Sequence, residues 1–481
     1  MSRQAEAVRQ APAGSVADGD PAGSRPQGMS VAPQTVVRDR SLTRDVFGTY
    51  GTRVLTIGLG MIMGIITARY LGPYNRGVFA LVYLLPSTVV TFAKMGLAQA
   101  SVYSIRRDRV TPERVVANAF LMSLMIGGVC IVLAVVLRGQ LLATFLHGVP
   151  EWAMLLTLPL IPLLLFESYF YAILQALGKF GLYNRRLLIG TTLLVVGMLT
   201  FLVGMGAGLR AAILVVVCVP IMMDLWLLIT VRRRFPFSFR LDLALLNREI
   251  RFGLKSHLQV VAQHLHLRAD AYLVNYFLDP TQVAFYNVAV RLAEFLLDVP
   301  DSVGMVLYPR LAALDEHTMH QLTAQACRRT LLVTTAGAVV LSVIGPKLIV
   351  LWYGQAFAPA GEPLLLVSVG IVMMSIFVLL TRNFTSRNKQ QVNIAAGVIA
   401  LGSNIGLNLF TIPAMGIVGA AMASAISYTA VALLLIGFFA RDSGLPLTDV
   451  LIAKPEDVRF FWGLGVRLVG RGKDFALRLA G

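Results

Sequence analysis

Long apolar runs separated by short polar breaks extend over most of the chain. Each run is roughly 20 residues or longer, enough to cross a hydrocarbon core of about 30 Å at about 1.5 Å per residue. The pattern predicts an all-α polytopic membrane protein. The twelve predicted spans lie near residues 50–70, 78–104, 115–137, 152–177, 187–206, 211–231, 256–278, 283–308, 330–352, 362–382, 391–412 and 417–439.

Basic residues concentrate in every second break. The breaks after the even-numbered spans hold most of the Arg and Lys, whereas the opposite breaks hold only Arg76, Arg138 and Arg210. Because cytoplasmic loops are enriched in basic residues, both termini are predicted to be cytoplasmic. The longest outward break, about 138–151, is too short to fold as an external domain. It therefore argues against a membrane glycosyltransferase or polymerase.

The two halves of the chain repeat each other. Residues 70–73 close the first predicted span and 277–280 close the seventh, while 208–212 and 416–421 mark corresponding later junctions. Because each half holds an even number of spans, the repeat is predicted to be parallel, six helices plus six. The expected parts are a disordered cytoplasmic tail, a first lobe, an amphipathic connector, a second lobe and a basic cytoplasmic tail, at residues 1–45, 46–232, 233–255, 256–440 and 441–481.

Two cytoplasmic segments have the pattern of helices that lie in the membrane plane. In the connector, Leu241, Leu245, Leu246 and Ile250 alternate with Arg240, Arg248 and Arg251. In the last segment, Phe460, Phe461, Trp462, Leu464 and Leu468 mix with Arg459, Arg467, Arg471 and Lys473. Such helices bind anionic lipids, which are therefore expected partners at the inner leaflet.

Composition agrees with a membrane protein and excludes other classes. Hydrophobic residues make up 57% of the chain and charged residues only 14%, with a mean hydropathy of +0.72. The net charge of +17 lies in the breaks, so it indicates topology rather than nucleic-acid binding. The cysteines Cys130, Cys218 and Cys327 lack metal-ligand spacing. No metal, cofactor, nucleotide-binding loop or nucleophile with its base is recognised, so the chain is expected to be a transporter rather than an enzyme.

Short motifs in both halves carry a family resemblance. Residues 67–80 read TARYLGPYNRGVFA and are followed by Pro86 and Gly96-Leu97. The second half holds Arg268-Ala269-Asp270, then the segment 283–289, Glu294 and Tyr308-Pro309-Arg310. Over about residues 45–440 these motifs resemble bacterial oligosaccharide (O-antigen-type) flippases. The resemblance implies the superfamily of multidrug, oligosaccharidyl-lipid and polysaccharide exporters, whose two six-helix lobes surround a central cavity.

The same resemblance implies a function. Members of the polysaccharide branch move polyprenyl-pyrophosphate-linked oligosaccharides across the bacterial inner membrane by alternating access, for cell-surface polysaccharides such as lipopolysaccharide O-antigen or exopolysaccharide. A lipid II-type flippase and a drug exporter of the same superfamily stay open as alternatives. An acidic interior would favour the drug exporter, whereas the charges within these spans are led by Arg and Lys. Other proteins of polysaccharide assembly are also open as partners.

Charged residues inside predicted spans are costly and point to candidate sites. In span seven, His257, His264, Arg268 and Asn275 form one stripe, and Gln259, Gln263, His266 and Asp270 form a second stripe almost opposite. This helix is therefore expected to lie between the cavity and its own lobe. In span eight, Asn287, Arg291, Glu294, Asp298 and Asp301 share a narrow arc.

These stripes give two sets of candidates. The candidate substrate-binding residues are Arg268, His264, Asn275, Lys94 and Arg53. The candidate buried charge network comprises Asp270, Arg291, Glu294 and Asp298, with an ion pair expected between Asp270 and Arg291. Arg268 is expected to have no partner in the lobe and to bind the pyrophosphate. The alternatives are structural ion pairs for these charges and an interfacial anchor for Arg53.

Overall fold

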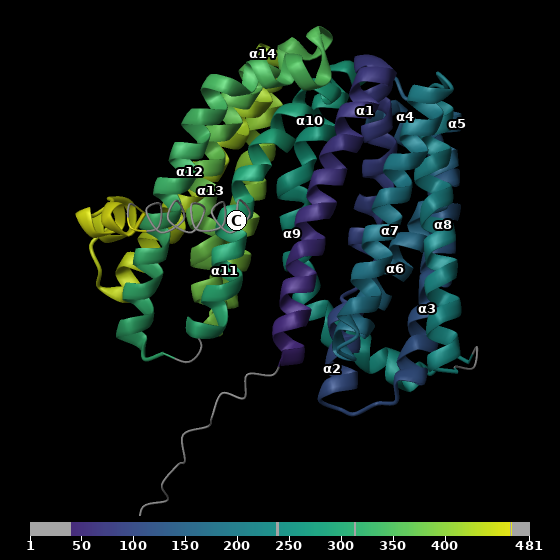
Figure 1. Cartoon of the computed structure of the whole chain (residues 1–481), viewed down its shortest axis with the longest axis horizontal. Helices are drawn as coiled ribbons and strands as arrows, with labels where there is room; N and C mark the ends of the chain where they lie inside the picture. Colours follow the sequence, from purple (N-terminus) through teal and green to yellow (C-terminus); the bar gives the residue numbers. More distant parts are fainter. Residues whose placement is uncertain (1–39, 237–239, 312–313, 462, 464–481) are drawn as a thin grey trace, which may run out of the picture. The chain divides into compact units, whose positions relative to one another are not determined.

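The computed structural model describes residues 40–236, 240–311, 314–461 and 463 (Figure 1). Within these residues the regular elements are all helical. The first half contains α1 (Arg40–Ala93), α2 (Leu97–Arg106), α3 (Pro112–Val136), α4 (Arg138–Thr144), α5 (Glu151–Thr157), α6 (Leu160–Ala176), α7 (Phe180–Met198), η1 (Leu199–Gly204) and α8 (Leu209–Arg234). The second half contains α9 (Leu243–Phe277), α10 (Pro280–Glu294), η2 (Phe295–Leu297), α11 (Asp298–Leu311), α12 (Glu316–Tyr353), η3 (Gln355–Ala360), α13 (Gly361–Ser386), α14 (Gln390–Ser443) and α15 (Thr448–Leu451).

Eight helical segments of the described chain are long and apolar enough to cross a membrane, so this is a multi-pass membrane protein. Gln390–Ser443 contains two of the predicted spans, and Gly51–Ala93 contains nearly all of the first and the beginning of the second. The rest of the second predicted span lies in α2, after a break at residues 94–96. Gly51–Ala93 and Gln390–Ser443 bend at Gly72 (φ 70°) and Gly416 (φ 60°), where a side chain would be strained. Helices α9 to α11 coincide with predicted spans seven and eight, but polar residues and the η2 turn interrupt their apolar pattern.

The connector expected at 233–255 is not a separate in-plane helix. From Leu243 onward its residues form the first turns of α9 and continue directly into predicted span seven. Leu245 and Leu246 are buried in the core, and Phe252 stacks on Tyr103 of α2 at 4.5 Å between ring centroids. This segment therefore packs on the first half, because its apolar face finds protein rather than lipid.

A side chain caps the start of α9. The Asp242 carboxylate accepts a hydrogen bond from the backbone nitrogen of Leu245 at 3.0 Å, and Arg114 Nε donates to it at 2.7 Å. These interactions hold the pKa of Asp242 below its usual range. The cap fixes the point at which α9 begins, and the Arg114 bond ties that point to α3.

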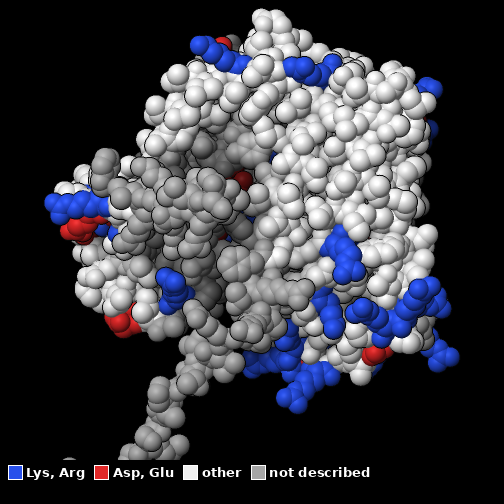
Figure 2. Space-filling model, viewed as in Figure 1, with Lys and Arg blue, Asp and Glu red and all other residues white. Residues whose placement is uncertain are grey.

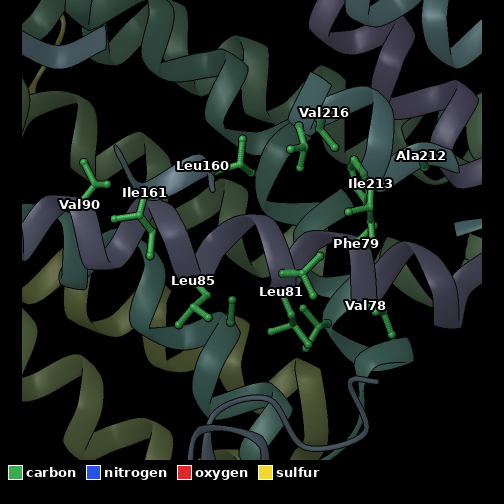
Figure 3. Packing of buried hydrophobic residues seen from close by; sticks show 14 of the residues in the cluster. Val78, Phe79, Leu81, Leu85, Val90, Leu160, Ile161, Ala212, Ile213 and Val216 are labelled. Atoms are coloured by element: carbon green, nitrogen blue, oxygen red, sulfur yellow. The ribbon is translucent and has the colours of Figure 1, made fainter. Parts of the chain in front are cut away.

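The core of the first half is built from helices distant in sequence. Figure 3 shows Leu81 and Leu85 of α1 in one cluster with Ile161 of α6 and Ile213 and Val216 of α8. A second cluster, which includes Leu311, Phe384 and Phe439, lies in the second half. In a lipid solvent such close packing, more than water exclusion, holds helices together.

Basic side chains gather at one end of the first half (Figure 2). Arg106 lies in the last turn of α2, and Arg232, Arg233 and Arg234 end α8. This clustering agrees with the predicted cytoplasmic side. The expected amphipathic tail is described only to 461 and at 463, so most of it lies outside the described residues, as does most of the predicted segment 1–45.

Candidate substrate-binding site

Helix α9 has polar partners on two faces, as its two stripes predict. On one face, His264 Nε2 lies 3.0 Å from Thr88 Oγ1 of α1, and His257 Nε2 lies 3.0 Å from the carbonyl oxygen of Phe92. On the other face, the buried His266 ring meets Tyr428 of α14 edge-on at 5.0 Å. Helix α9 thus lies between α1 and α14.

A cluster of three charges joins α9 to α10. Arg268 Nη1 lies 3.0 Å from Glu294 Oε1, and Arg291 Nη1 lies 3.4 Å from Glu294 Oε2. The side chains of Arg268 and Arg291 are 35% and 59% exposed, whereas Glu294 is 14% exposed. The expectation that Arg268 lacks a partner in its lobe is therefore wrong. The antiparallel turn at Asp279 brings Glu294 opposite it, which spacing along one helix cannot reveal.

Lys94 lies near this cluster and adds a further positive charge. It follows the last residue of α1, at a break before α2 where Met95 and Gly96 have φ of 47° and 70°. Its ammonium group has no hydrogen bond or ion pair with the described residues, and both Lys94 and Arg268 act electrostatically on His264. Lys94, Arg268 and Arg291 carry three positive charges and Glu294 carries one negative charge, so the region has an excess of two positive charges. Figure 2 shows a hollow in one face of the molecule, with acidic side-chain atoms visible inside it.

Asp270 belongs to a different, fully enclosed network. Its carboxylate accepts hydrogen bonds from Tyr286 Oη at 2.8 Å, Ser424 Oγ at 2.6 Å and Asn408 Nδ2 at 2.8 Å. The predicted ion pair with Arg291 is wrong, because Asp270 points toward α14 while Arg291 binds Glu294. Sequence reasoning missed these donors, although Asn404 and Asn408 one turn apart in an apolar helix were a signal. Among the described residues, no three His, Cys, Asp or Glu side chains form a metal site.

Arg53 and Asp298 connect the halves at the predicted cytoplasmic end. Arg53 Nη2 lies 3.4 Å from Asp298 Oδ1 and 3.9 Å from Asp301 Oδ2. Arg382 approaches the other oxygen of Asp301 at 3.7 Å. All four side chains are about half exposed. Asp298 therefore pairs with the first half rather than with the seventh and eighth spans, and each such exposed contact is weak.

The opposite, outer end is held by bonds to backbone carbonyls. Asn275 is fully buried, and its Nδ2 donates to the carbonyls of Phe145 and His147 at 3.2 and 3.1 Å. Arg69 donates from Nε to the carbonyl of Trp352 at 2.7 Å and from Nη2 to that of Leu351. The structure thus places Asn275 away from Lys94, His264 and Arg268, in a contact between the halves.

Comparison with known proteins identifies a family for this chain. Residues 42–315, more than half of the chain, match the family model described as polysaccharide biosynthesis protein. The chain belongs to the polysaccharide biosynthesis protein family. This confirms the family resemblance drawn from the motifs.

One curated relative of this family member is the probable low-salt glycan biosynthesis flippase Agl15 of Haloferax volcanii. The two are 22% identical over 163 residues, which is 33% of this chain and 34% of the relative. The chain thus matches about a third of that relative's length.

Solved structures define the fold of this polysaccharide biosynthesis protein. The lipid II flippase MurJ in an inward closed conformation matches with a TM-score of 0.71 at 15% identity, over 85% of this chain and 89% of MurJ. An inward-facing multidrug resistance MATE family transporter of the MOP superfamily matches at 0.65 and 15% identity, over 81% and 94%. A MOP superfamily transporter from Pyrococcus furiosus matches at 0.61 and 13%, over 84% and 96%. The fold is that of the MOP superfamily.

Proposed function

We propose that this protein is a flippase that moves a polyprenyl-pyrophosphate-linked oligosaccharide from the cytoplasmic to the outer leaflet of a bacterial inner membrane, for cell-surface polysaccharide. Membership of the polysaccharide biosynthesis family supports the glycan class. The name of the curated relative, a probable glycan flippase, supports the transport step.

The observation that carries the proposal is the excess positive charge around α9. Arg268 and Arg291 share a single carboxylate, that of Glu294, and Lys94 adds a third positive charge close to His264. A pyrophosphate supplies the missing negative charge, and the flat guanidinium of Arg268 can grip its oxygens through two parallel hydrogen bonds. His264, held by Thr88, offers a polar neighbour. A cationic drug would be repelled by the same cluster, so the drug-exporter alternative is disfavoured.

The contacts between the halves support alternating access. At the outer end, Arg69 and Asn275 bind carbonyls of the opposite half, and Gly77 lies directly against the carbonyl of Pro280. At the predicted cytoplasmic end, the half-exposed Arg53–Asp298 pair is the weaker contact. Opening to the cytoplasm would break the Arg53 contacts, whereas opening outward would break those of Arg69 and Asn275.

The membrane arrangement is part of the same proposal. Dividing α1 at Gly72 and α14 at Gly416, and counting α9 and α10 to α11 as spans, gives the twelve spans expected from the sequence. Six would fall in each proposed lobe, 46–232 and 256–440. An even number of spans would leave both termini on one side of the membrane, and the basic residues in the even-numbered breaks favour the cytoplasmic side.

The test is to locate the lipid-linked oligosaccharide in cells that lack this chain. We expect it to accumulate where a reagent confined to the outer side cannot modify it, and to become accessible when the native chain is restored. Equal accessibility without the chain would exclude the proposal. Measuring lipid II in the same cells separates the lipid II-type alternative, since only that alternative predicts its accumulation.

A further inference from the structure

A groove outside the candidate substrate site runs along α11 and α12, which pack side by side (Figure 1). Its volume is about 480 Å³, within the range of small-molecule sites. Val299, Val303 and Val306 of α11 line one wall at helical spacing, and Leu322 and Val333 of α12 line the other. The groove is therefore mainly apolar along three turns of each helix.

Arginines lie on the same groove. Arg310, near the end of α11, is exposed and forms no hydrogen bond or ion pair with the described residues. Arg329 of α12 uses Nε to bind Asp457 at 2.9 Å, and its guanidinium lies 4.0 Å from the centroid of the Phe460 ring. The terminal nitrogens of Arg329 keep their donors for a ligand.

The segment after α14, residues 444–461, completes the site. Phe460 and Phe461 line the groove, and the fully buried Asp457 holds their segment on α12 by accepting from Arg328 and Arg329, both at 2.9 Å. Burial by itself would raise the pKa of Asp457, but the hydrogen bonds from both arginines and the Lys454 backbone hold it below its usual range. The Asp457 carboxylate therefore stays charged at neutral pH, and so keeps its bonds to both arginines.

Charge and position favour one kind of ligand. Arg328 and Arg329 share the single carboxylate of Asp457. Together with Arg310 they give three positive charges against one negative charge, an excess of two. Arg310 lies in a break predicted to be cytoplasmic, whereas Val299 and Val333 lie in predicted spans. An apolar channel that enters the membrane beside cations at its cytoplasmic end matches a lipid with an anionic headgroup.

We propose that this groove holds one anionic glycerophospholipid of the inner leaflet, with its phosphodiester at Arg310 and Arg329 and an acyl chain between α11 and α12. The lipid would join the segment after α14 to α11, the helix that carries the Arg53 contacts. This site differs from the substrate site, and it would exist whether or not the protein is a flippase.

The experiment measures lipid retained by the purified full-length chain. The protein is reconstituted in vesicles of phosphatidylglycerol and phosphatidylethanolamine, extracted in detergent, and its bound lipid is counted by mass spectrometry. The groove variant combines Arg310→Ala with Val306→Trp, and both sites are exposed, so folding should persist. Arg234→Ala at the end of α8 is the matched control, since it removes an exposed arginine far from the groove in sequence.

We expect the native chain and the control to retain one more phosphatidylglycerol than the groove variant, with retention about tenfold weaker in the variant. A diazirine on the acyl chain should cross-link to peptides covering 299–310 and 322–333. Equal retention by the groove variant, or equal retention of phosphatidylethanolamine, would overturn the proposal. Cross-links confined to other peptides would also overturn it. Displacement of the lipid by polyprenyl phosphate would overturn it too, because the groove would then hold the polyprenyl tail of the substrate.

Discussion

Replacing Arg268 tests the proposed site most directly. In the structure Arg268 shares Glu294 with Arg291, at 3.0 and 3.4 Å respectively. Arg268→Ala removes one cation but leaves Glu294 paired, so no buried charge is stranded. The lost contact involves a side chain that is 35% exposed, and such pairs are worth at most about 1 kcal/mol. The variant should therefore insert and accumulate almost as the native chain does.

The functional loss should be much larger than the loss of stability. A charge-assisted hydrogen bond contributes about 1.5–3 kcal/mol, so substrate binding should weaken roughly 10-fold to 150-fold. We expect Arg268→Ala to abolish complementation of a strain that lacks the chain, scored by its surface polysaccharide. Arg268→Lys should restore only part of it, because an ammonium group lacks the planar fork of guanidinium.

A matched control separates the effect of removing any ion-paired arginine from the effect of removing an arginine of the proposed binding site. Arg138 binds Glu151 at 2.9 Å in an outward break, with both side chains about half exposed. Arg138→Ala removes a similar ion pair and should complement normally. Protein amounts are compared by immunoblot, and thermal unfolding is measured in detergent. Full activity of Arg268→Ala, or its failure to accumulate, would refute the reasoning, and the anion site would then be sought at Lys94 and Arg53.

Three further changes test neighbouring contacts, and a fusion tests topology. Glu294→Gln should lower the amount of folded protein more than Arg268→Ala does, because it leaves two guanidinium groups without a carboxylate. Asp270→Asn should also lower it more than Arg268→Ala, and should destabilise the protein by about 1–3 kcal/mol, because the amide nitrogen that replaces one carboxylate oxygen cannot accept from the donors that face it. Gly77→Ala should disrupt the outer contact, since its Cβ would lie 1.6 Å from the carbonyl oxygen of Pro280; protease accessibility of the outer loops reports this. A reporter fused after Gly481 should be active only in the cytoplasm.

Each of these predictions has a contradicting result. If Glu294→Gln or Asp270→Asn accumulates to the native amount, the prediction for that variant is wrong, and the groups that bound the carboxylate must be hydrated or must have other partners. An unchanged protease pattern for the glycine variant would mean that the backbone yields locally. Gly58→Ala is its control, because a Cβ there meets nothing within 4 Å. A periplasmic reporter signal would overturn the twelve-span arrangement.

Properties that depend on one helix at a time could be predicted from the sequence. Hydropathy marked the apolar helices, and the glycines at 72 and 416 lie at the junctions that the repeat indicated. The two polar stripes of α9 do face different neighbours, as their angular separation requires. These features follow from residue type and the helical period alone, so no knowledge of neighbouring helices was needed.

The choice of partners was decided only by the tertiary structure. Arg268 meets Glu294, Asp270 meets donors of α14, and Asn275 is buried against Phe145 and His147. Spacing along a helix fixes which side chains share a face, but not the rotation of that helix or what lies opposite. A carboxylate in a membrane can be satisfied by a guanidinium or by several neutral donors, and the sequence is compatible with both. For Asp270, packing between α9, α10 and α14 selected the neutral donors.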